Sequence, residues 1–438
     1  MAHTWPQLVG PVLLGHAQRR KKEGADLYLG DGAVAMMEPA QAQLRVLELY
    51  SGIGGMHYAL KESYTNAKVV AAIDINTIAN EVYKHNFPNT YLYPKTIEGM
   101  TLDEFNKLDF DMVLMSPPCQ PFTRIGSQKD VLDPRTKSFL HILDILPRLS
   151  KTPKYILLEN VKGFESSVAR DKLIQALESC RYIYQEFLLS PILLGIPNSR
   201  LRYFLLAKLQ PDAFCFQTSY QIIERFPDHE VTNSRFTDGH SRFDQIISTG
   251  DNKKEHNNSG YCAENDESET NMTRLYKLET PEHLKKKQIQ NNNLSIQMIQ
   301  EFLEEELKDP RPYFIPPKTL LRYALILDIV GQSCRRSVCF TKGYGHYAEG
   351  TGSVLKTAPD VQLSEVFQSF QTLSEDEKLS RLSKLKLRYF TPREIANLHG
   401  FPPEFSFPET ISLRQSYRLL GNSLNIKVVA KLISLMVE

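Results

Sequence analysis

Beyond residue 44, the chain alternates short apolar runs with longer stretches in which apolar and polar residues mix. The short runs are rich in Val, Ile and Leu and contain few polar residues, which is typical of strands buried on both faces of a sheet. The predicted strands cover residues 44–50, 68–75, 110–116, 154–160 and 200–209.

The stretches between these runs place apolar residues three and four positions apart, the spacing of a helix with one face on a sheet. The predicted helices cover residues 76–87, 138–149 and 170–180. Repeated alternation of strand and helix predicts an α/β fold with a doubly wound, Rossmann-like parallel sheet. Ligands of such sheets bind at the carboxyl ends of the strands.

The pattern is interrupted between residues 228 and 274, where Asn, Ser, Asp, Glu, Lys and His replace most apolar residues. Such a segment cannot bury enough apolar surface to offset its ordering entropy, so we expect a flexible linker. Residues 275–390 then form a predicted smaller domain, with a charged helix around 298–308. The apolar helix near the end of the chain is expected to pack back on the first domain, which we define as residues 44–227 plus 391–438.

Residues 1–43 form a predicted disordered extension. Its apolar run LVGPVLLG precedes the basic QRRKK, which is the reverse of a secretory signal. No apolar run approaches the length that spans a bilayer, so we expect no membrane association.

Charge and cysteine content narrow the classes of function. The 52 basic and 51 acidic residues nearly cancel, so any nucleic acid must be bound by a local groove and not by a global positive field. The six cysteines include no C-x-x-C pair, which argues against a structural zinc site and a disulfide framework. We therefore expect no metal, reduced thiols, and a location in the cytoplasm, with the nucleus as the alternative.

The turn YSGIGG at residues 50–55 directly follows the first predicted strand and opens a helix. A glycine turn at this place is often only a turn, but Asp74 ends the second strand 20 residues after Gly54, where a carboxylate can bind the hydroxyls of a ribose. The turn is not G-x-G-x-x-G and has no phosphate-loop lysine. S-adenosylmethionine therefore fits at least as well as NAD.

Cys119 follows the strand at 110–116 and lies in the sequence PPCQP. A free cysteine is usually a small buried hydrophobe, but the flanking prolines restrict the backbone and favour a loop tip over a core. A reactive thiolate needs positive neighbours, and Arg200 and Arg202 in NSRLRYF are the candidates.

Glu159 ends the strand at 154–160, where it finishes an otherwise apolar run. A structural ion pair is the plain interpretation. At a strand end beside a ligand cleft, the carboxyl group would instead be partly desolvated, with a raised pKa, and could donate a proton near neutral pH.

Five motifs, SGIGG, PPCQPF, ENV, RLRYF and GNS, occur in this order over residues 46–438. In order and spacing they resemble the DNA-type cytosine-5 methyltransferases. The absence of further reader domains and the triplet Cys339-Phe340-Thr341 resemble the branch of that family that methylates transfer RNA. The resemblance implies a cytosine in the anticodon loop of tRNA as the substrate, with aspartate tRNA expected, weak DNA binding at most, and a monomeric enzyme.

The resemblance also implies a mechanism. Cys119 would add to carbon 6 of the cytosine while Glu159 protonates or hydrogen-bonds the ring nitrogen, and Arg200 and Arg202 would hold the base. Residues 275–390 would be the target-recognition domain. The residues implied in binding S-adenosylmethionine are Ile53, Gly54, Gly55, Asp74, Ile97, Ser116, Asn422 and Ser423.

One departure from the family pattern is KTI at residues 95–97, where relatives usually carry an acid before the isoleucine. The adenine amine would then bind through backbone. Two alternatives stay open: a DNA methyltransferase, and a catalytically silent protein that binds nucleic acid.

A weaker feature is a group of cationic and aromatic residues in the smaller domain that could contact RNA or form an ordinary solvated face. Its members are Arg335, Arg336, Phe340, Lys342, Tyr344 and Tyr347.

Overall fold

The computed structural model describes residues 42–118, 136–219, 221–227 and 280–438. Residues 43–438 form one compact unit. The predicted extension and the predicted linker at 228–274 lie outside the described residues, and the proposed domain boundaries stay predictions.

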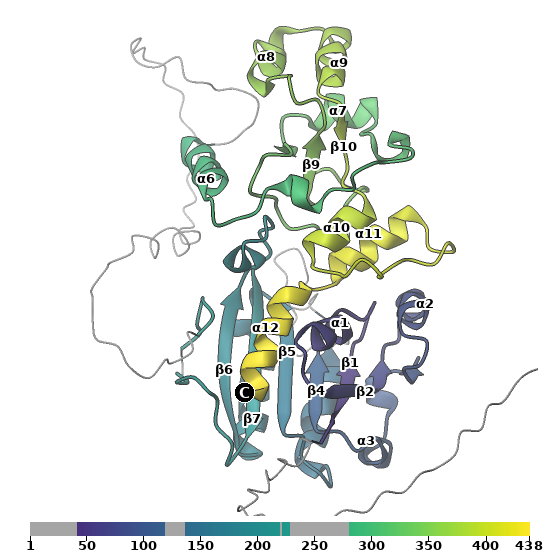
Figure 1. Ribbon diagram of the computed structural model, residues 1–438, viewed down its shortest axis with the longest axis vertical. Coiled ribbons are helices and arrows are strands. Elements are labelled where there is room, and N and C mark those ends of the chain that lie inside the picture. The colour runs from purple at the N-terminus through teal and green to yellow at the C-terminus, as the bar shows by residue number, and fades with distance from the viewer. Residues whose placement is uncertain (1–41, 119–135, 220, 228–279) are drawn as a thin grey trace, which may run out of the picture. The chain divides into compact units, whose positions relative to one another are not determined.

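A seven-stranded sheet organises the first part of the chain (Figure 1). Its strand order is β3-β2-β1-β4-β5-β7-β6. The strands are β1 (Leu44–Leu49), β2 (Ala67–Ile73), β3 (Leu92–Tyr93), β4 (Met112–Met115), β5 (Tyr155–Val161), β6 (Tyr182–Leu189) and β7 (Arg202–Leu209).

The sheet is mixed and not purely parallel, so the expectation of a parallel sheet was wrong at one strand. β7 is antiparallel to both of its neighbours, β5 and β6, while the other pairings are parallel. The physical reason is the connection. Residues 190–201 join β6 to β7 with only a short 3-10 turn, and a parallel pairing would need a longer crossover, usually a helix.

Helices cover both faces of the sheet, which confirms the doubly wound α/β prediction. Alternate residues of β1 enter different cores: Val46 joins the cluster that contains α1 and α12, and Leu47 the cluster that contains α4 and α5. The helices of this part are α1 (Gly55–Glu62), α2 (Thr77–Asn86), α3 (Leu102–Leu108), α4 (Lys137–Ile145), α5 (Val168–Ser179), α10 (Pro392–Leu398), α11 (Leu413–Asn422) and α12 (Ile426–Val437).

The last helix returns to the sheet, as predicted. In Figure 1, α12 lies across β5 and β7, and it packs against α1. The segment Leu413–Val437 is long and apolar enough to cross a membrane by length and composition, yet 61% of its apolar window is buried inside the structure. We therefore interpret α12 as a core helix.

A smaller domain with its own core follows. Its sheet has the order β10-β9-β8, and its core includes Leu320, Ile329 and Phe367. The elements are α6 (Pro281–Asn292), α7 (Pro317–Tyr323), β8 (Asp328–Val330), β9 (Ser353–Lys356), α8 (Leu363–Phe367), α9 (Glu375–Lys384) and β10 (Leu387–Arg388).

The charged helix expected around 298–308 is absent from this described part of the chain, which has only a 3-10 turn at Ile299–Phe302. The backbone N–H groups of Ile299 and Gln300 donate instead to the carbonyls of Cys334 (2.8 Å) and Gln332 (3.0 Å). Pairing with a distant segment therefore holds the start of this stretch in a conformation other than an α-helix.

Candidate active site

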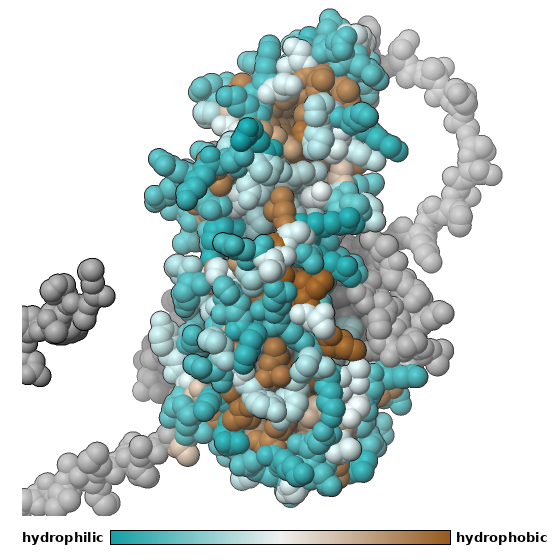
Figure 2. Space-filling model, turned by 90° about the vertical axis from the view of Figure 1, so that its right-hand side faces the viewer, coloured by the Kyte–Doolittle hydropathy of each residue, from teal (hydrophilic) through white to brown (hydrophobic). Residues whose placement is uncertain are grey.

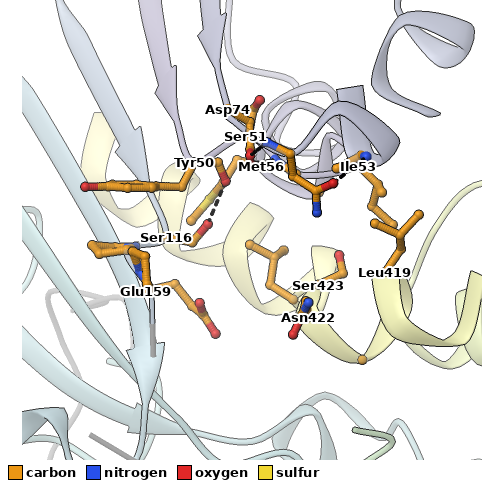
Figure 3. Close-up of a pocket in the computed structure, with 18 of the residues that line it drawn as sticks. Tyr50, Ser51, Ile53, Met56, Asp74, Ser116, Glu159, Leu419, Asn422 and Ser423 are labelled. Carbon is orange, nitrogen blue, oxygen red and sulfur yellow. Dashed lines mark hydrogen bonds between the residues drawn. The ribbon is translucent and has the colours of Figure 1, made fainter. Parts of the chain in front are cut away.

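A cavity of about 380 Å³ opens at the carboxyl ends of β1, β2, β4 and β5. This volume is in the range of small-molecule sites. Figure 3 shows Ser116 directly after β4 and Glu159 on β5, with Leu419, Asn422 and Ser423 at the end of α11 across the cavity. The cavity is thus closed by two segments more than 200 residues apart in the chain.

The glycine turn after β1 forms one wall. Gly54 has φ +86°, and a Cβ there would overlap the ring of Phe87. A Cβ on Gly55 would lie 3.1 Å from both Leu424 Cγ and Ser423 Oγ. Glycine is favoured at Gly54 by the left-handed backbone angle, and at Gly55 by the close approach of the C-terminal segment.

Asp74 shapes the same turn from the end of β2. Its Oδ2 accepts a hydrogen bond from Gly52 N–H (2.8 Å) and its Oδ1 from Asn76 N–H (2.8 Å). Burial raises the pKa of the Asp74 carboxyl, and the backbone N–H groups of Asn76, Gly52 and Ile75 oppose that shift. Each carboxylate oxygen keeps acceptor capacity for a ligand on the cavity side.

Two serines on this wall differ in what they offer a ligand. The Ser116 hydroxyl donates to the Tyr50 carbonyl (3.2 Å), so it ties β4 to the glycine turn. The Ser51 hydroxyl is buried and has no hydrogen-bond partner among the described residues. A buried polar atom without a partner is costly, and a polar ligand in the cavity would satisfy it.

The remaining predicted cofactor residues divide into two groups. Ile53, Asn422 and Ser423 line the cavity together with Gly55, Asp74 and Ser116, whereas Gly54 and Ile97 are not among the lining residues. Ile97 is 3% exposed and belongs to the hydrophobic core, and its contact with adenine stays a prediction.

Sequence reasoning missed several lining residues, among them Met56, Leu419 and Ile75. Ile75 is 64% exposed directly after Asp74. Its place just beyond the carboxyl end of a predicted strand could have identified Ile75 from the sequence. Apolar walls with a few polar groups suit an adenosine-containing ligand, so the residues present fit S-adenosylmethionine.

Glu159 lies on β5 at the opposite side of the cavity and is 9% exposed. Its Oε1 is 3.5 Å from Arg202 Nε. Burial raises the pKa of the Glu159 carboxyl, and the charges of Arg202 and Arg200 only partly oppose this. A larger fraction of the group is therefore protonated near neutral pH than for an ordinary glutamate.

Arg200 and Arg202 have different surroundings. Arg200 is 3% exposed and donates to the carbonyls of Phe340 (3.1 Å), Gly421 (3.3 Å) and Ser423. Arg200 therefore joins the smaller domain to the C-terminal segment. Arg202 is the arginine that lies beside Glu159.

Cys339 of the triplet Cys339-Phe340-Thr341 is a second thiol beside these two arginines. Its sulfur accepts hydrogen bonds from Arg200 Nη1 (3.4 Å) and Arg202 Nη2 (3.6 Å). Burial alone would raise the pKa of the thiol, but the two guanidinium groups outweigh burial and lower it. The adjacent arginines thus favour the thiolate form.

Cys119 lies outside the described residues. The described chain lines the cavity as far as Pro118, and Asn160 Nδ2 donates to the Pro117 carbonyl (3.4 Å).

The group of cationic and aromatic residues that the sequence suggested as an RNA contact is mostly not exposed on the surface. Phe340 and Tyr344 are buried in the core, and Arg336 donates to both carboxylate oxygens of Asp328 (3.0 and 3.1 Å). Lys342 and Tyr347 remain exposed.

A doubly wound sheet, a glycine turn after β1, a carboxylate after β2 and a nucleoside-sized cavity together define the class of S-adenosylmethionine-dependent methyltransferases. The chain belongs to the C-5 cytosine-specific DNA methylase family, whose model matches residues 44–438. S-adenosylmethionine is the methyl donor of this family.

Named relatives agree with this assignment. A tRNA (cytosine(38)-C(5))-methyltransferase from Homo sapiens is 59% identical over 92% of this chain and 100% of that protein. A DNA (cytosine-5)-methyltransferase from Dictyostelium discoideum is 38% identical over 90% of this chain and 95% of that protein. The crystal structure of a mutant DNMT2 from Spodoptera frugiperda has a TM-score of 0.68 and 38% identity, and covers 90% of this chain and 100% of that one.

Proposed function

We propose that this protein transfers a methyl group from S-adenosylmethionine to carbon 5 of cytosine 38 in the anticodon loop of tRNA. The observation that carries the proposal is the buried carboxyl group of Glu159, with its raised pKa, on the wall of the cavity that the glycine turn and Asp74 also line. The high identity to tRNA methyltransferases supports tRNA as the substrate.

The chemistry follows from the low nucleophilicity of carbon 5. The thiolate of Cys119 adds to carbon 6, and Glu159 donates its proton or a hydrogen bond to the ring nitrogen, which turns carbon 5 into an enamine carbon. Bound S-adenosylmethionine supplies the electrophilic methyl group. Loss of the carbon 5 proton and expulsion of the thiolate complete the reaction. Arg202 supports the charge on the base, while Arg200 positions the segments around it.

The cofactor would be held by the turn at Ile53 and Gly55, by Asp74, and by Asn422 and Ser423 from the end of α11. The open hydroxyl of Ser51 is a further partner for it. The target base must leave its stack to reach this cavity, which costs less in an RNA loop than in a duplex.

The test is transfer of labelled methyl groups to tRNA and to duplex DNA by the wild type, Cys119→Ala and Glu159→Gln. We expect transfer to tRNA, loss of activity in Cys119→Ala, and a kcat lowered about 10²- to 10⁴-fold in Glu159→Gln. Because a proton donor acts only below its pKa, wild-type activity should fall on the alkaline side. Activity in Cys119→Ala would refute the assigned nucleophile.

A DNA methyltransferase is the second candidate, favoured by the relative from Dictyostelium. Faster transfer to duplex DNA than to tRNA in the same assay would promote it. Binding of tRNA without transfer to either substrate would instead indicate the catalytically silent alternative.

We also propose that the protein acts as a monomer in the cytoplasm, with the nucleus as the alternative. Light scattering after size-exclusion chromatography tests whether the protein is a monomer. Cell fractionation tests its location.

A further inference from the structure

A second cavity of about 400 Å³ lies between α7 of the smaller domain and the first half of α11. Most of its lining residues carry a ring. The aromatic and proline residues that line it are Pro312, Phe314, Pro316, Tyr323, His346, Tyr347, Tyr389 and Tyr417.

Tyr347 is the most exposed of its large apolar side chains, at 62%. Its position is nevertheless set by the backbone, because its N–H donates to the Gly343 carbonyl (2.9 Å) and its ring packs so closely on Gly343 that a Cβ there would be 2.9 Å from Tyr347 Cδ2. The His346 ring centroid is 4.5 Å away. The ring is therefore held in place while much of it stays open to solvent.

Cationic side chains surround these rings. The Arg322 guanidinium lies 5.2 Å over the Tyr323 ring, and Arg414 Nη2 is 3.2 Å from His346 Nε2. Lys342 is exposed on the same loop as Tyr347. Glu349 is the acidic residue among the lining residues. The balance of charge suits a polyanion whose bases face the rings.

The two cavities are neighbours along α11. Tyr417 lines the second cavity and Gly421 the first, and four helical residues span about 6 Å. The loop that carries Tyr347 also touches both, since Gly421 packs directly on the backbone of Thr341 and Lys342, and Gly345 packs on the Tyr417 ring. A strand that enters the first cavity therefore passes close to the second.

We propose that the second cavity stacks an unpaired nucleobase of the RNA substrate that lies next to the target cytosine, with Tyr347 as the stacking platform. Flat, sequence-tolerant stacking on aromatic rings is how proteins hold unpaired bases. The inference rests on the proposed function for the identity of the RNA.

The test compares Tyr347→Ala with Tyr347→Phe, using tRNA and an anticodon stem–loop RNA. Loss of the ring should raise KM for RNA about ten-fold or more, as for other base-stacking aromatics, and leave KM for S-adenosylmethionine unchanged. Tyr347→Phe should behave as the wild type, because stacking needs the ring and not the hydroxyl. Tyr64→Ala is the matched control, since Tyr64 is 91% exposed and is not a lining residue of this cavity.

A second experiment identifies which nucleotide of the RNA stacks on Tyr347. In it, the nucleotide on each side of the target cytosine is replaced in turn with an abasic site. One abasic site should weaken binding to the wild type and have no further effect on Tyr347→Ala. The proposal would be overturned if Tyr347→Ala bound RNA as well as the wild type does. It would also be overturned if Tyr347→Phe lost as much RNA affinity as Tyr347→Ala. RNA binding measured by filter retention keeps this result separate from the proposed function, which fails only if the wild type does not methylate tRNA.

Discussion

Glu159 and His399 are both buried, and burial moves the pKa of each group toward its neutral form. For Glu159 this is useful, because a neutral carboxyl group can donate a proton. For His399 burial has a cost, because the ring is 0% exposed at the end of α10 and neither ring nitrogen has a hydrogen-bond partner in the described part of the chain. The nearby charges of Arg200 and Arg202 lower its pKa further.

His399→Leu is therefore expected to raise the free energy of unfolding by about 1–3 kcal/mol, because it removes two unpaired buried polar atoms at similar volume. The gain should grow as the pH falls below about 6.5, the ordinary pKa of histidine. There the unfolded chain binds a proton that the folded one does not, so wild-type stability decreases with falling pH. Denaturant unfolding between pH 5.5 and 8 measures this.

The exposed His283 on α6 provides the control, and His283→Leu should leave the stability curve nearly unchanged. An equal or lower stability of His399→Leu at every pH would show that the ring has partners in solution.

Among the elements, α11 contributes to both cavities, its first half to the second cavity and its last turn to the first. A Cβ on Gly421 would overlap the backbone of Thr341 and Lys342. The helix begins with a capping box in which Ser412 and Gln415 bond each other's backbone N–H groups, which fixes its first turn. Because Gly421 has no side chain, the last turn of α11 can approach the smaller domain closely.

Gly421→Ala should lower the free energy of unfolding by about 1–3 kcal/mol, as expected for overpacking, and weaken binding of S-adenosylmethionine because Asn422 and Ser423 shift with the helix end. Calorimetric titration and thermal unfolding measure the two effects. Gly331→Ala is the matched control, since nothing lies within 4 Å of a Cβ at that position. Equal behaviour of the two variants would contradict the packing argument.

In the whole molecule, the larger and smaller domains share a continuous core that includes Val330 and Phe340 as well as residues of α12. Arg200 adds polar bonds across the same boundary, through the carbonyls of Phe340 and Ser423. Substitution of Arg200 by alanine should therefore affect mainly the stability, and substitution of Arg202 mainly the catalytic rate.

Arg200→Ala leaves several buried carbonyls without a donor and should lower the free energy of unfolding by about 3 kcal/mol. Arg202→Ala should lower kcat more than stability, because Arg202 lies beside Glu159. Unfolding curves and single-turnover methyl transfer separate the two. A stable Arg200→Ala with reduced kcat alone would show that Arg200 acts on the base and not on the packing.

The sequence alone determined where most strands and helices of the large sheet lie, because their apolar periodicity reflects local burial. It also identified Asp74 and Glu159, since a carboxylate that ends an apolar run is visible without coordinates.

Only the tertiary structure decided the direction of β7, the loss of the helix around 298–308, the burial of Ile97, Phe340 and Tyr344, and the meeting of Cys339 with Arg200 and Arg202. Each of these depends on contacts between segments far apart in the chain, and local patterns of residues do not encode which distant segment will supply the partner.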